Sequence, residues 1–189
     1  YYRLNTVALL EDLRRRQSGG DLKGETYIAN VATNVRMFED YHAKALRVGT
    51  IVEEFVARAI REDFPNFSKG RSPDESLEIV IYGYADPRPI AGTYDEAAVR
   101  FLDMNGVEHV VSPGDSLDNF SLAGLRAHYA KEYLEQRFRE SAAHGQREYL
   151  DLVDRGLIRW SVISGNVDDI TRGDNQEKRR IRVEFRRVK

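Results

Sequence analysis

The apolar positions of the chain follow two different periods in a regular order. Apolar and polar residues alternate in 25–38 and in 179–188, which is typical of strands. Apolar residues recur every three or four positions in 51–60 and in 121–138, which is the period of an amphipathic helix. Leu77–Tyr84 is apolar on both faces, as expected for a central strand covered on both sides.

Weaker signals complete this order. A strand is predicted at 157–165, and Asn105-Gly106 between two strand-like runs predicts a β-hairpin. Residues 147–156 read as a short helix closed by Gly156, and 63–76 as a polar loop. At the beginning of the chain, a helical lead-in and a glycine-rich joint occupy residues 1–24.

The order is therefore strand, helix, strand, inserted hairpin, helix, strand, strand. Helices placed between strands favour crossover connections. We expect an α+β fold, a mixed β-sheet with helices packed on one face. Its domain covers 25–189 and carries the hairpin in an insertion at 87–118.

Composition narrows the function classes. The chain has 189 residues, 41% of them hydrophobic and 32% charged, a net charge of −2 and no cysteine. This excludes disulfide and thiol chemistry and argues against general nucleic-acid binding. No run approaches the length of a transmembrane helix. Because the chain begins at Tyr1 without methionine, we expect a signal peptide or a membrane anchor upstream of that residue.

Two charged residues are the main candidates for a binding site. Asp86 follows the covered strand just beyond Gly83, at the carboxyl end where open α/β sheets place their ligands. Arg126 lies in the first turns of the 121–138 helix, where a cation does not suit the helix dipole and an anionic ligand would explain it. Taken singly, each has a simpler explanation, because Asp86 before Pro87 is common turn chemistry and helical arginines usually face solvent.

The other polar residues of the sequence form no recognisable catalytic or metal-binding motif. The four histidines have no zinc-ligand spacing, and catalytic serine, phosphate-loop and dinucleotide motifs are absent. We therefore predict no enzyme activity, no catalytic residues, no cofactor and no metal site. Residues 172–189 are rich in arginine, but their alternation predicts a solvated or acid-paired strand face. Asn119 or Ser121 is expected to cap the 121–138 helix.

Four short motifs in order resemble the OmpA-like domain, the peptidoglycan-binding module shared with flagellar motor protein B. "GYAD" (83–86) is similar to the family's Gly-His-Thr-Asp, and "NFSLAGLRA" (119–127) to its Asn-x-x-Leu-Ser-x-x-Arg-Ala. "FEDYHAKAL" (38–46) is similar to the exit of its first strand, and "RIRVEF" (180–185) to its closing strand. The resemblance spans about residues 30–188 and implies a βαβαββ fold.

The resemblance also implies roles for particular residues. In the family, an aspartate and an arginine hold the diaminopimelate of the peptidoglycan stem peptide. Carried over, Asp86 takes the ammonium group and Arg126 the carboxylate, and Asn119 braces the loop. The remaining members of the implied ligand-binding set are Tyr84, Ala85 and Leu122.

The chain departs from the family pattern at several positions. Tyr84 and Ala85 replace the family's histidine and threonine, and Ala123 replaces the serine that usually follows the leucine. In the closing strand, Arg180 and Ile181 replace an asparagine and an arginine. The loop between Asp86 and Asn119 is also far longer than in the family.

The resemblance leads to two functional hypotheses. In the first, the domain lies in the periplasm and anchors a membrane or envelope complex non-covalently to peptidoglycan. It reaches the partners in that complex through the N-terminal segment. A homodimer is a further expectation, and no nucleic acid is expected to bind. In the second, the fold is a protein-interaction or dimerisation scaffold that works through the 87–118 insertion. A cell-wall hydrolase ranks lowest, because no paired acid and base or metal site is evident.

Overall fold

The computed structural model describes residues 52–85, 87, 92–143, 145, 147–167 and 181–189. Apart from its first two residues, the chain divides into two compact units, Arg3–Ala57 and Arg58–Lys189. Nearly all described residues belong to the second unit, and the account below concerns that unit. The predicted lead-in helix, the glycine-rich joint and the strand at 25–38 lie outside the described residues.

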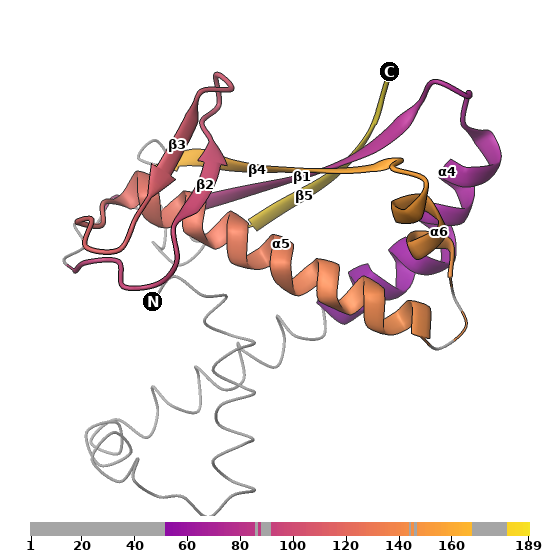
Figure 1. Cartoon of the computed structure of the whole chain (residues 1–189), viewed down its shortest axis with the longest axis horizontal. Helices are drawn as coiled ribbons and strands as arrows, with labels where there is room; N and C mark the ends of the chain where they lie inside the picture. The colour runs from indigo at the N-terminus through magenta and orange to yellow at the C-terminus, as the bar shows by residue number, and fades with distance from the viewer. Residues whose placement is uncertain (1–51, 86, 88–91, 144, 146, 168–180) are drawn as a thin grey trace, which may run out of the picture. The chain divides into compact units, whose positions relative to one another are not determined.

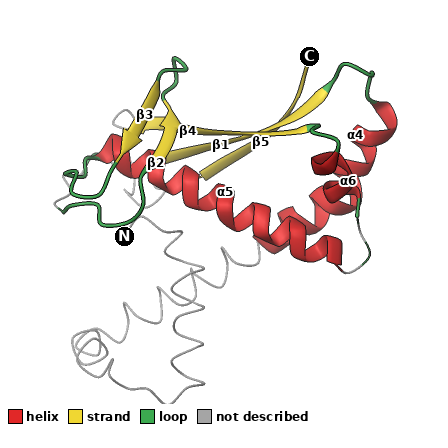
Figure 2. Cartoon of the chain, in the orientation of Figure 1, coloured by secondary structure: helices red, strands yellow, loops and turns green. Residues whose placement is uncertain are grey.

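The described elements form a sheet with helices, drawn in Figures 1 and 2. The helical elements are a helical stretch over 52–58, the π-helical η1 (Ala59–Asp63), α4 (Phe64–Gly70), α5 (Asn119–Ala143) and α6 (Glu148–Asp154). The strands are β1 (Ser76–Ala85), β2 (Val99–Leu102), β3 (Glu108–Val111), β4 (Ile158–Val167) and β5 (Ile181–Val188). Their order in the sheet is β3-β2-β4-β1-β5.

The sheet is mixed, as predicted. β1 pairs in parallel with β4 and antiparallel with β5. β4 also pairs in parallel with β2, which forms the antiparallel hairpin with β3. Parallel neighbours need a crossover, and the long helix α5 runs along the sheet between them in sequence (Figure 1). The expected α+β class and the hairpin at Asn105-Gly106 are therefore confirmed.

The core lies between the sheet and its helices. In the middle of β1, Ile79, Val80 and Ile81 are fully buried, as the apolar run predicted. At one end, the rings of Phe64 and Phe138 meet edge to face with centroids 5.0 Å apart. At the other end, a cluster joins the hairpin to α5 and β4; its buried members are Tyr94, Val99, Phe101, Val111 and Leu125.

The predicted polar loop at 63–76 is wrong for its first half, because Phe64–Gly70 forms α4. Pro65 is the second residue of α4, which continues directly from the π-helical η1. Phe64 and Phe67 stand three residues apart and are 0% and 3% exposed, so burial of both rings stabilises the turn. The α5 helix likewise extends past the predicted 121–138 at both ends.

At Gly83, β1 lies in close backbone contact with α5. β1 runs through Gly83 to Ala85, one residue beyond the predicted Leu77–Tyr84. A Cβ built on Gly83 would lie 2.0 Å from the carbonyl oxygen of Ala123 and 2.9 Å from the amide nitrogen of Ala127. The glycine is therefore needed for backbone packing between the strand and the helix.

We expect Gly83→Ala to lower the free energy of unfolding by roughly 2–3 kcal/mol, because the new methyl group meets rigid backbone rather than a movable side chain. Urea denaturation measures the change. Gly70→Ala is the matched control: its added Cβ would meet only the flexible end of Arg187, at 3.3 Å. A Gly83→Ala protein as stable as the control would contradict this account of the β1–α5 contact.

Candidate functional site

The start of α5 is fixed by Asp118. Its Oδ1 accepts a hydrogen bond from the backbone N–H of Ser121 at 2.7 Å, and its carbonyl accepts one from Leu122 at 2.9 Å. The prediction that Asn119 or Ser121 caps the helix is therefore wrong, because the residue before Asn119 has the capping geometry. The sequence contained a signal for this cap, because aspartate is one of the residues preferred immediately before the first residue of a helix.

A buried serine ties this end of α5 to the sheet. Ser164 of β4 is 0% exposed, and its hydroxyl donates to the carbonyl of Phe120 at 2.9 Å. Sequence reasoning missed Ser164, because a serine in a strand carries no local sign of the helix that it contacts. This bond and the Gly83 contact together set the position of α5 beside β1 and β4.

Arg126 is brought to the carboxyl end of β1. Its Nη1 donates to the carbonyl oxygen of Tyr84 at 2.8 Å, across 42 residues of sequence. The side chain is partly buried there. Asp86 follows Tyr84 by two positions and lies outside the described residues. The guanidinium is thus held at the carboxyl end of β1.

The other predicted site residues surround this position in different ways. Ala85 and Leu122 are 1% and 6% exposed, so both are core residues in the described structure. The ring of Tyr84 lies against Gly165 of β4, where an added Cβ would come within 2.6 Å of it. Asn119 is the first residue of α5 and is half-buried.

The insertion extends the sheet past β4. β2 reaches β4 through the Leu102–Ile163 pair, and β3 forms the outer strand of the hairpin (Figure 2). Its base is fastened to α5 by Tyr129, whose hydroxyl donates to Glu96 at 2.6 Å and lies 3.1 Å from the hydroxyl of Tyr94. Burial raises the pKa of Tyr129 well above its ordinary value, and these two bonds add to the effect.

The arginine-rich strand β5 has an acid-paired face, as predicted. Glu184 forms an ion pair with Arg182 at 2.9 Å and accepts a hydrogen bond from Arg186 at 2.6 Å. Both guanidinium groups lie over the ring of Tyr82, the nearer at 4.3 Å from its centroid. These arginines are therefore held by their neighbours within the sheet.

The described residues show neither a metal cluster nor a membrane span. No three or more of their histidines and carboxylates are arranged to hold a metal ion. His109 lies 3.5 Å from Asp103 in the hairpin. Burial lowers the pKa of His128, which lies 3.4 Å from Glu132 on α5. None of the helices in the described ranges is long and apolar enough to cross a membrane.

Comparisons with protein-family models, with curated proteins and with solved structures each found no match to this chain. The functional argument therefore depends on the residues themselves.

We expect Asp118→Ala to destabilise the protein by about 1 kcal/mol, because the first turn of α5 loses its side-chain cap. Thermal or urea denaturation measures the loss. Asp118→Asn retains an oxygen acceptor and should recover most of the stability. Ser121→Ala is the control for the alternative cap and should stay within about 0.5 kcal/mol of wild type; the reverse ranking of Asp118→Ala and Ser121→Ala would contradict the assignment.

Proposed function

We propose that the domain binds peptidoglycan non-covalently, through the diaminopimelate of the stem peptide, and so anchors an envelope complex to the cell wall. The observation that supports this most is the bond from Arg126 to the Tyr84 carbonyl at 2.8 Å, which places a guanidinium at the carboxyl end of β1. The resemblance in sequence assigns this arginine and Asp86 to one ligand. A periplasmic location, with a membrane tether upstream, belongs to the same proposal.

The chemistry of the pair suits this ligand. The free end of diaminopimelate carries an ammonium group and a carboxylate on one carbon. A guanidinium offers five N–H donors in a planar fork, and a backbone carbonyl carries no net charge, so the bond to Tyr84 orients Arg126 without itself neutralising the guanidinium. A carboxylate at Asp86 would then face the ammonium group, and both contacts would be charge-assisted hydrogen bonds.

We expect Asp86→Asn and Arg126→Gln each to weaken binding to diaminopimelate-type peptidoglycan by about 2 kcal/mol, roughly thirtyfold, because each removes one charge-assisted contact. Co-sedimentation with purified sacculi at several protein concentrations measures the affinity.

The matched controls are Asp74→Asn and Arg159→Gln, which make the same chemical changes at exposed positions of the described structure. Peptidoglycan that carries lysine in place of diaminopimelate lacks the second carboxylate and should bind like the Arg126 variant. Equal co-sedimentation of wild type, Asp86→Asn and Arg126→Gln would refute the proposal.

A second candidate function is supported by the hairpin. Within the described part of the chain, the large hydrophobic side chains that are exposed all belong to it: Met104 is 51%, Val107 54% and Val110 45% exposed. β3 is also an outer strand of the described sheet. Apolar side chains on an outer strand are typical of a surface that pairs with another chain, which favours an interaction or dimerisation scaffold.

Under this second function, Val110→Lys should abolish concentration-dependent self-association, because a lysine on an outer strand opposes edge-to-edge pairing. Sedimentation velocity over a hundredfold range of concentration measures the effect. Gln136→Lys on α5 adds the same charge outside the hairpin and should leave the profile unchanged. A wild-type protein that stays monomeric throughout this range would rule out the homodimer.

A further inference from the structure

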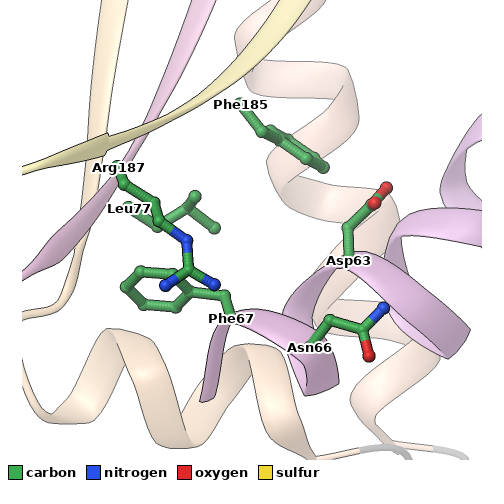
Figure 3. A pocket seen from close by; sticks show the side chains of 6 residues that line it. All are labelled: Asp63, Asn66, Phe67, Leu77, Phe185 and Arg187. Carbon is green, nitrogen blue, oxygen red and sulfur yellow. The ribbon is translucent and has the colours of Figure 1, made fainter. Parts of the chain in front are cut away.

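A cavity lies away from the Arg126 position. It has a volume of about 210 Å³ and lies beside α4, near the start of β1 and the end of β5 (Figure 3). The residues that line it are Asp63, Asn66, Phe67, Leu77, Phe185 and Arg187. Because Leu77 is near the beginning of β1 and Tyr84 near its end, this cavity is separate from the proposed peptidoglycan site.

The lining has an apolar part and a polar rim. Phe67 and Leu77 are 3% and 4% exposed, and Phe185 is half-buried against Phe64, with ring centroids 5.6 Å apart. These side chains offer an apolar surface to a hydrocarbon group. The volume is below the roughly 300–1,000 Å³ of sites for drug-sized ligands, so the ligand must be small.

Arg187 is held in place at this cavity. Its Nη1 donates to the carbonyl of Gly70 at 2.7 Å and to the carboxylate of Glu75 at 3.3 Å. Its Cζ lies 5.5 Å from the centroid of the Phe67 ring, and Figure 3 shows the guanidinium in front of that ring. Within the described residues, Nη2 makes no hydrogen bond, so an oriented donor remains for an anion.

The other polar groups define the charge of the ligand. Glu75 already has its own partners, since it also accepts from the backbone N–H of Ser72 at 3.0 Å, and this bond lowers its pKa. Asp63 accepts from Arg58 at 3.3 Å. The Asn66 side chain has no hydrogen-bond partner among the described residues and can donate to an oxygen.

We propose that this cavity binds a small carboxylate with an aliphatic body, with the carboxylate on Arg187 and Asn66 and the hydrocarbon on Phe67, Leu77 and Phe185. The fixed guanidinium loses little side-chain freedom when the ligand binds. An alcohol would accept only a weaker, uncharged hydrogen bond from Nη2, and an ammonium group would be repelled by the guanidinium, so the site discriminates by charge.

The experiment is an NMR titration of the 189-residue protein with 4-methylpentanoate, with its alcohol and amine counterparts, and with acetate. We expect saturable amide shifts at the cavity residues with 4-methylpentanoate, and at least tenfold weaker binding of the three others. Acetate tests the need for the apolar body, and the alcohol and amine test the need for the negative charge.

Variants test the assignment of the groups. Arg187→Gln should weaken binding of 4-methylpentanoate at least tenfold, whereas Arg159→Gln, the same change on exposed β4 surface, should not alter it. Asn66→Asp leaves the Gly70 and Glu75 bonds intact and should weaken binding several-fold by placing a second negative charge at the rim. Asp63→Asn should leave binding unchanged or tighten it.

No saturable shifts with wild type, equal affinity for the amine, or full binding by both Arg187→Gln and Asn66→Asp would each overturn the proposal. Arg126→Gln should retain binding of 4-methylpentanoate, so a failure of the peptidoglycan proposal is distinguishable from a failure of this one.

Discussion

The close contact between α5 and β1 at Gly83 determines most of the described architecture. The helix presents small residues where it meets the sheet: Ala123 and Ala127 are fully buried against β1, and an added Cβ on Gly124 would lie 2.6 Å from the ring of Phe101. Because Ala123 and Ala127 carry no more than a methyl group, the helix backbone lies close against the strand. The buried core of the hairpin then fits against the same stretch of α5.

This contact also explains why Arg126 reaches the end of β1. Ala127 lies against Gly83, and the residue before it in α5 projects beside the last residues of the strand. A bulkier residue at position 83 would move the helix outward and increase the distance from Arg126 to the Tyr84 carbonyl. The position of the guanidinium therefore depends on a glycine that has no polar chemistry of its own.

The sequence predicted elements with a clear period and missed features that depend on contacts between distant segments. β1, the hairpin, α5 and β5 follow directly from their apolar patterns. α4 was missed because Pro65 and its polar neighbours obscure the spacing of two buried phenylalanines. For the candidate site, the motifs singled out Arg126, but the bond to the Tyr84 carbonyl and the support from Ser164 depend on tertiary packing that no local pattern contains.

The surroundings of the arginines separate those that hold the sheet together from those suited to an anion. Arg182 and Arg186 lie on Glu184 and Tyr82, so their charge is balanced within the sheet. Arg126 and Arg187 instead each donate to a backbone carbonyl, at 2.8 and 2.7 Å. A carbonyl orients a guanidinium but carries no net charge, so these two bonds do not themselves neutralise the positive charge. Because Glu75 also lies 3.3 Å from Arg187, a carboxylate in that cavity must share this arginine with a protein side chain. A carboxylate there therefore gains less from Arg187 than it would from a guanidinium without an acidic neighbour, and the apolar body of the ligand has to supply the rest of the affinity.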